Sequence, residues 1–221
     1  MERPWQLIQR GLIRRLQPWS QWPGPVAVRA SLADQDHRAI QQLAAAVSQT
    51  LVRPDTLAIA LGANLPSHAG SPADTLLAIR PLLEQVLQQW QPVPLRFYWS
   101  PLFETAPVGG PAGQSNYVNG ALLVEGCLSA CEKFCTDPAQ AEAALELLQA
   151  LQHLEAQFGR PPQPERQRWG PRSLDLDLLW WGDLELDRPA TAATPALQLP
   201  HPLWRERLFV LEPLMSLTTG A

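Results

Sequence analysis

Two carboxylates separated by one residue are the first feature of this sequence that indicates chemistry. Asp175 and Asp177 alternate with Leu174, Leu176 and Leu178. Because side chains at positions i and i+2 of a strand point to the same face, we expect both carboxylates on one face and the leucines on the other. Like charges so close repel each other, and burying both requires a compensating cation. A pair of oxygen ligands favours a hard ion such as Mg2+.

Arginines precede the two aspartates, at Arg160, Arg166, Arg168 and Arg172. Guanidinium groups bind phosphate oxygens in pairs, so arginines beside carboxylates for Mg2+ predict phosphoryl transfer. From this stretch alone, a surface salt-bridge cluster on an edge strand remains the alternative. The sequence has no Gly-x-x-x-x-Gly-Lys-[Ser/Thr] phosphate loop, and its single lysine, Lys133, lies elsewhere. The chain is therefore not expected to be a P-loop enzyme.

The elements that must position these residues follow from apolar runs and from the residues that interrupt them. Strands are predicted over residues 56–61, 95–99, 117–125 and 175–180. One helix is predicted from the Ser71 N-cap and Pro72 to about residue 89, and a second from the Asp137 N-cap to Gly159. A short helix over 39–51 and an apolar segment over 208–211 complete the pattern. The order strand, helix, strand, strand, helix, strand predicts an α+β fold, a ferredoxin-like sandwich with helices packed on an antiparallel sheet.

Composition divides the 221-residue chain into two unequal parts. Residues 1–53 carry seven arginines and three acidic residues, a net charge of +4, while the remainder carries −8. Prolines gather at 18–25, which predicts a linker. We expect residues 1–55 to be a basic, proline-containing and poorly ordered N-terminal extension, and residues 56–221 to be one enzyme domain. A transit peptide or interfacial helix is the alternative for the start of the extension.

Several classes of protein are excluded or disfavoured. No apolar run is long enough to span a bilayer, and the net charge of −4 argues against a general nucleic-acid partner. Cys127, Cys131 and Cys135 recur every four residues, which would place them along one face of a helix. Their number and spacing match neither a disulfide framework nor a zinc site, so we interpret them as small core residues of a reduced, cytoplasmic protein.

One segment closely resembles a known signature, Arg168-Trp169-Gly170-Pro171-Arg172-Ser173-Leu174-Asp175-Leu176-Asp177. It is similar to that of the 6-hydroxymethyl-7,8-dihydropterin pyrophosphokinase family, which has Thr in place of Ser173. Three further blocks resemble the family in the expected order, at residues 60–65, at 104–109 with 116–119, and at 199–211. The resemblance covers about residues 56–216 and leaves the extension unexplained.

The resemblance implies an ATP-dependent diphosphotransferase of folate biosynthesis. Such an enzyme moves pyrophosphate from ATP to the hydroxymethyl group of the pterin and releases AMP. It implies two Mg2+ ions held by Asp175 and Asp177, with ATP and a pterin as partners, no nucleic acid, no membrane span and a monomeric state. Catalytic roles fall on Arg160, Arg166, Arg172, Asp175 and Asp177. ATP-binding roles fall on Gln152, Glu155, Arg160, Trp169, Arg172, Leu178, His201 and Arg207. Pterin-binding roles fall on Thr105, Val108, Tyr117, Asn119, Trp169 and Phe209.

The sequence departs from the family pattern in its loops. The segment from Arg160 to Trp169 is longer by about two residues, and Pro162 stands where many members carry a second arginine, a role we assign to Arg166. The pterin-side loop has an extra residue at or near Gly110, and residues 126–137 are an insertion. Two other functions therefore stay open at this point. One is a binding module without turnover, and the other is a different phosphotransferase that uses the same metal pair.

Overall fold

A computed structural model describes residues 14–15, 37–127, 138–161, 169–191 and 194–218 of the chain. The elements, in chain order, are β1 (Arg14–Arg15), α2 (His37–Leu51), β2 (Thr56–Ala63), α3 (Pro72–Trp90), β3 (Arg96–Trp99), β4 (Phe103–Thr105), β5 (Tyr117–Glu125), α4 (Pro138–Gln157), β6 (Asp175–Trp181), β7 (Leu186–Arg188), β8 (Leu197–Leu199), the 3-10 helix η4 (Trp204–Glu206) and α5 (Leu208–Thr218).

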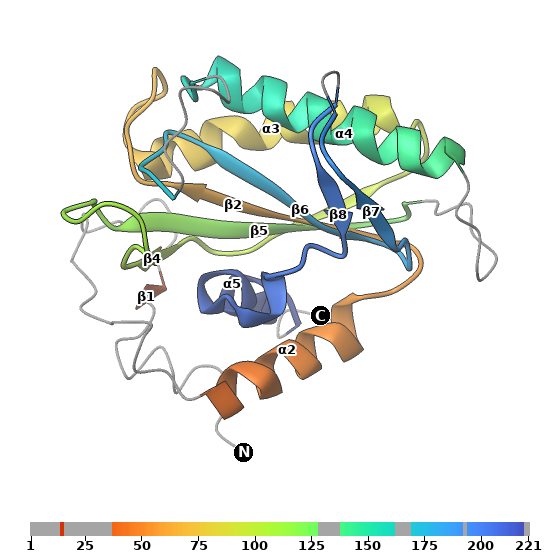
Figure 1. Cartoon of the computed structure of the whole chain (residues 1–221), viewed down its shortest axis with the longest axis horizontal. Coiled ribbons are helices and arrows are strands. Elements are labelled where there is room, and N and C mark those ends of the chain that lie inside the picture. Colours follow the sequence, from red (N-terminus) through yellow and green to blue (C-terminus); the bar gives the residue numbers. More distant parts are fainter. Residues whose placement is uncertain (1–13, 16–36, 128–137, 162–168, 192–193, 219–221) are drawn as a thin grey trace.

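Helices cover both faces of an antiparallel sheet. The strand order is β1-β4-β5-β2-β6, β3 pairs with β5 along the same edge as β4, and β7 and β8 form a separate two-stranded sheet. Figure 1 shows α3 and α4 on one face of the sheet, α5 on the other face, and α2 beyond α5. The predicted α+β sandwich is confirmed. No helix in the described ranges is long and apolar enough to cross a membrane.

The central strand β2 is buried along its whole length because it has a hydrophobic layer on each side. Leu57, Ile59 and Leu61 point into the core beneath α3 and α4. Ala58 and Ala60 point into a second core, which contains residues of α5 and α2. Because both faces of β2 are buried, the strand lacks the alternation of polar and apolar residues that is typical of a strand with one solvent-exposed face.

The sequence predicted the long elements within a few residues, and the predicted cap of α3 is confirmed. The Ser71 side chain accepts a hydrogen bond from the Asp74 backbone N–H, and the Asp74 carboxylate accepts one from the Ser71 N–H. The short strands β4, β7 and β8 were not predicted, because three residues show no periodicity. Apolar residues 208–211 begin the helix α5.

Part of the expected extension forms the helix α2 in this structure. This helix was predicted over 39–51, and it buries Leu43, Ala44, Val47 and Leu51. Cys127 does not lie on a helix: it follows β5 and is buried. Cys131, Cys135, the proline-rich linker and most of the segment for which a transit peptide or interfacial helix was the alternative lie outside the described residues.

A buried carboxyl group in α5 gives the fold a pH dependence. Glu212 is almost fully buried, and burial raises its pKa from 4.5 to about 8. Between these two pH values the folded chain keeps a proton that the unfolded chain loses. The contribution of Glu212 to the free energy of unfolding is therefore fully present at low pH and is lost as the pH rises through 8. The slope from this group is at most about 1.4 kcal/mol per pH unit.

We predict that Glu212→Gln removes this part of the pH dependence. Urea unfolding measured from pH 6 to pH 9 should show a falling free energy of unfolding for the wild-type protein and a flatter profile for the variant. The amide keeps the shape of the side chain and cannot ionise. Parallel profiles for the two proteins would contradict the assignment.

Candidate functional site

Two cavities meet at the predicted carboxylate pair, and Asp175 and Asp177 line both of them. The first, which we call the aromatic cavity, has a volume of about 320 Å³ and is also lined by Gly62, Thr105, Val108, Tyr117, Asn119, Trp169, Arg172, Arg207 and Phe209. The second, which we call the helix-side cavity, has a volume of about 400 Å³ and is also lined by Gln152, Glu155, Arg160, Leu178 and His201. The two aspartates therefore stand at the border between two binding spaces.

Strand β6 places the aspartates as the alternation predicted. Leu176 and Leu178 are buried in the core beneath α3 and α4, while Asp175 and Asp177 are partly accessible on the opposite face. Burial and the charge of Asp175 raise the pKa of Asp177 from 3.8 to about 6, although Arg207, Arg172 and Arg160 oppose the shift. Ionising both carboxylates therefore costs free energy, and an additional cation would recover it.

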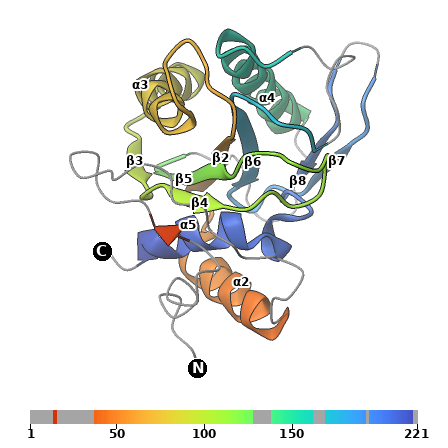
Figure 2. The ribbon, with the colours of Figure 1, turned by 90° about the vertical axis from the view of Figure 1, so that its left-hand side faces the viewer.

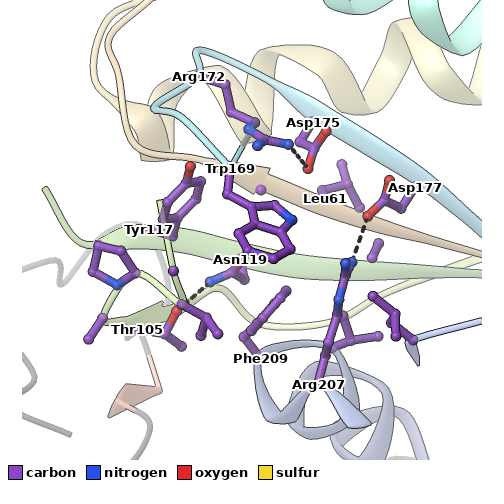
Figure 3. A pocket seen from close by; sticks show the side chains of 18 of the residues that line it. Leu61, Thr105, Tyr117, Asn119, Trp169, Arg172, Asp175, Asp177, Arg207 and Phe209 are labelled. Atoms are coloured by element: carbon purple, nitrogen blue, oxygen red, sulfur yellow. Dashed lines mark hydrogen bonds and ion pairs between the residues drawn. The ribbon is translucent and has the colours of Figure 1, made fainter. Parts of the chain in front are cut away.

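Three arginines from different parts of the chain neutralise the pair. Arg172 Nη1 lies 2.7 Å from Asp175 Oδ2, and Arg160 Nη1 lies 2.6 Å from Asp175 Oδ1. Arg207 Nη1 lies 3.3 Å from Asp177 Oδ2 (Figure 3). Arg160 follows α4, and Arg207 follows η4. Guanidinium groups thus surround the carboxylates on several sides, as binding of a polyanion requires.

Glu155 fixes the strand that carries the aspartates. The residue is 2% exposed, and its Oε1 accepts a hydrogen bond of 2.8 Å from the Leu176 backbone N–H. The same oxygen is ion-paired with Arg160. Glu155 lines the helix-side cavity, where the resemblance predicted a nucleotide contact, and in this structure it also holds Arg160 and β6 in place.

The floor of the aromatic cavity is a glycine between two strands. Gly62 lies opposite Asp175 on one side and opposite Asn119 on the other. A Cβ at this position would lie 3.2 Å from Asn119 Oδ1, so a larger residue would press on the amide. The Asn119 amide nitrogen donates a hydrogen bond to Thr105 Oγ1 at 2.9 Å. The amide is thereby held in one orientation, close to Asp175.

Aromatic rings enclose this cavity. Tyr117, Trp169 and Phe209 surround it in Figure 3. The Tyr117 hydroxyl donates a hydrogen bond to the Gly170 carbonyl at 3.0 Å, which orients the Tyr117 ring. Trp169 is 49% exposed and has a φ of 55°, which is an unusual backbone conformation for a bulky residue. A flat, apolar ligand with polar edges fits this environment.

Two amide side chains tie the surrounding loops together. Gln114 Nε2 donates to the Trp169 carbonyl at 3.1 Å, and Asn64 Nδ2 donates to the Ser115 carbonyl at 3.1 Å. Asn64 Oδ1 accepts from the Arg172 backbone N–H at 2.8 Å. Asn64 and Gln114 were not predicted as site residues. Asn64 is a buried polar residue at the end of an apolar strand, and that position in the sequence could have marked it as a site residue. Nothing in the sequence distinguished Gln114.

His201 lies on the helix-side cavity in its neutral form. Burial lowers its pKa from 6.5 to about 4, and the charge of Arg207 acts in the same direction. Its Nδ1 accepts a hydrogen bond of 3.2 Å from the Leu203 backbone N–H, so the neutral ring carries its proton on Nε2. His201 can therefore donate one hydrogen bond without adding charge.

The structure brings together all but one of the predicted site residues. Arg166, to which we assigned a catalytic role, lies outside the described residues, as does Pro162. Val108 is on the rim of the aromatic cavity and is 49% exposed. Trp169, Arg172 and Arg207, which were assigned to ATP, line the aromatic cavity. These positions are observed, whereas the roles of the residues remain predictions.

We predict that Glu155→Ala lowers the free energy of unfolding by roughly 1–3 kcal/mol, because it leaves the buried Leu176 N–H without this acceptor. Glu155→Gln should cost less, because the amide oxygen can still accept that hydrogen bond. Gln152→Ala, one turn earlier on the same helix and on the same cavity, is the matched control. Urea unfolding checks the order, and equal losses for Glu155→Ala and Gln152→Ala would contradict it.

Comparison with known proteins identifies relatives of this chain. It is 39% identical over 118 residues to a protein of Pseudomonas aeruginosa, and these residues are 53% of this chain and 58% of the relative. It is 36% identical over 104 residues to a protein of a Synechocystis species, covering 47% of this chain and 42% of the relative. It is 33% identical over 118 residues to a protein of Bacillus subtilis, covering 53% and 56%. Each is named 2-amino-4-hydroxy-6-hydroxymethyldihydropteridine pyrophosphokinase.

The matched region thus spans about half the length of these curated relatives. The family model of 7,8-dihydro-6-hydroxymethylpterin-pyrophosphokinase matches residues 58–219, which include both cavities and the carboxylate pair. Because this match extends over most of the chain, the protein belongs to the 7,8-dihydro-6-hydroxymethylpterin-pyrophosphokinase family.

Proposed function

We propose that this protein transfers pyrophosphate from ATP to the hydroxymethyl group of 6-hydroxymethyl-7,8-dihydropterin, releasing AMP, as a step of folate biosynthesis. The observation that carries the proposal is the position of Asp175 and Asp177 on the border of both cavities. One cavity is rich in aromatic side chains, and the other lies beside arginines and a neutral histidine. A donor and an acceptor bound in the two cavities would meet at the carboxylates.

The carboxylate pair fits Mg2+. Its donors are oxygens only, and burial and the charge of Asp175 raise the pKa of Asp177, so a bound cation would favour the ionised form of the pair. Among the described residues no group of three or more His, Cys, Asp and Glu side chains gathers as a metal cage. Mg2+ normally binds one or two carboxylates together with water and substrate phosphates, so two protein ligands suffice. We propose that Asp175 and Asp177 hold two such ions, which when bound would neutralise charge on the phosphate oxygens.

The arginines support the proposal through a change of partners. The guanidinium groups of Arg160, Arg172 and Arg207 are paired with the aspartates. A triphosphate offers them stronger acceptors, and turning toward it would release the carboxylates for the metal. The three guanidinium groups would then pair with phosphate oxygens in place of the carboxylates. Arg160 and Arg172 would also stabilise charge that develops on the transferred group.

The nucleotide would occupy the helix-side cavity. Gln152 and Leu178 line it together with His201, whose Nε2–H can donate to a nucleotide atom. Glu155 would act mainly by holding Arg160. The pterin would lie in the aromatic cavity against Tyr117 and Phe209, with Trp169 restricting access of water.

The pterin edge would meet polar groups already on the cavity wall. Asn119 carries both a donor and an acceptor, and its hydrogen bond to Thr105 fixes its orientation. The substrate hydroxyl would attack the β-phosphorus in line, and positioning would supply most of the rate enhancement. We further propose that the enzyme is a cytoplasmic monomer. The buried, free Cys127 fits a reducing compartment.

We predict that the protein, incubated with ATP, Mg2+ and hydroxymethyldihydropterin, forms AMP. ADP as the nucleotide product would indicate ordinary kinase chemistry, and binding of substrates without any product would indicate a binding module.

We expect Asp177→Ala to lower the rate of AMP formation at least about a hundredfold, because both metal binding and charge balance are lost. Asp183→Ala, which removes an exposed carboxylate just after β6, is the matched control and should retain wild-type activity.

The fold of the Asp177→Ala variant provides a second check. Removing a carboxylate whose pKa is raised to about 6 should not lower stability at pH 8, where the wild-type protein bears the cost of ionising it. Thermal unfolding at pH 8 measures this. A folded variant with undiminished AMP formation would exclude the metal role of Asp177.

The two cavities should be separable by kinetics. Phe209→Ala should raise the KM for the pterin on the order of tenfold, since about 1.4 kcal/mol of ring contact is lost, and should leave the KM for ATP nearly unchanged. His201→Ala should have the opposite pattern because its ring lines the other cavity. Initial rates measured with each substrate varied in turn test this. A parallel rise of both constants in both variants would contradict the division.

A further inference from the structure

The second core of the protein lies directly behind one wall of the aromatic cavity. Helix α2 precedes the region matched by the family, which begins at residue 58. It packs against α5 and η4, on the side away from the sheet (Figure 2). The buried face of α2 belongs to one hydrophobic cluster with Phe103 of β4, Trp204 of η4, and Leu208 and Leu211 of α5.

The wall between α2 and the cavity is thin. Trp204 is fully buried, and the neighbouring Leu203 and Glu206 line the aromatic cavity. Arg207 follows directly and reaches Asp177, and Phe209 lies two residues further along. A shift of η4 would therefore move Arg207 and Phe209 together, because both follow it without an intervening loop. The buried side chains of α2 belong to the same hydrophobic cluster as Trp204, and α2 contacts η4.

A second contact of the N-terminal segment supports the opposite wall. The backbone of β1 pairs antiparallel with β4, with Arg14 opposite Glu104 and Arg15 opposite Phe103. On its other edge β4 pairs with β5, where Thr105 lies opposite Tyr117. Thr105 is the residue that orients Asn119. The contacts that α2 and β1 make with η4 and β4 thus lie behind walls of the aromatic cavity, whereas the helix-side cavity is built from α4, β6, β8 and the adjoining loops.

We propose that the N-terminal segment is a positioning element for the acceptor side of the site. Through α2 it fixes η4, and thereby Arg207 and Phe209, at the geometry that binds the flat substrate. Its positioning residues are Leu43, Ala44, Val47 and Leu51 of α2. The inference rests on the proposed function for the identity of the flat ligand.

The test compares equal losses of core packing on opposite faces of the sheet. Leu43→Ala removes packing behind η4, while Leu87→Ala removes a buried leucine of α3 in the other core. Both should lower stability, and urea unfolding of each gives the loss. We expect Leu43→Ala to raise the KM for the pterin roughly three- to tenfold over that of Leu87→Ala, with the KM for ATP equal in the two variants. If either alanine variant does not fold, Leu43→Val and Leu87→Val provide the same comparison with a smaller loss of stability.

A binding measurement separates this inference from the proposed function. Pterin fluorescence, titrated in the presence of a non-hydrolysable ATP analogue, should show the same weakening for Leu43→Ala as the KM does. If the wild-type protein forms AMP and the two variants bind pterin equally well, the positioning role is overturned and the proposed function stands. If the wild-type protein neither forms AMP nor binds pterin, the proposed function is overturned, and this inference with it.

Discussion

The site depends on keeping two carboxylates on one face of a single strand. At the distances between i and i+2 side chains, Asp175 and Asp177 repel each other, and burial strengthens the repulsion, as the raised pKa of Asp177 shows. The fold meets this cost with guanidinium groups, one after α4, one from the loop before β6 and one after η4. Segments distant in the sequence must therefore converge on β6, and the neighbouring strand must leave room for them. Gly62 and Ala60, the small residues opposite the aspartates, leave that room.

For these segments to converge on β6, the loops must be fixed in place as well as the strands. Asn64 joins the end of β2 to the backbone at Arg172 and at Ser115. Gln114 joins the loop before β5 to Trp169. These contacts hold the backbone at Arg172 and at Trp169, two residues that line the aromatic cavity. Ordered loops let the polar groups face a ligand in advance, so that less reorganisation accompanies binding.

The sequence predicted those elements of the fold that leave a periodic pattern or a characteristic capping residue. Alternation of Asp and Leu predicted β6 and the face on which its carboxylates lie, and the cap at Ser71 predicted the start of α3. It did not predict α5, because the apolar run from Leu208 to Leu211 fits a buried strand as well as a helix. The role of Gln114 could not be predicted either. Its amide nitrogen donates to backbone carbonyls 5 and 55 residues away and its amide oxygen accepts from Asn64, 50 residues away, and no local pattern marks such partners.

Arg207 connects the two halves of the structure. Its guanidinium reaches Asp177 and lies 5.7 Å from the centre of the Phe209 ring, so one side chain contacts both the proposed metal site and the proposed acceptor site. Its backbone follows η4, whose Trp204 is packed into the core shared with α2. Packing on the α5 face of the sheet and the ion pair with Asp177 thus converge on the same residue. Helix α2, which belongs to the segment that the net charge of +4 over residues 1–53 had marked as different in kind, thus packs in the same core as the helix that precedes Arg207.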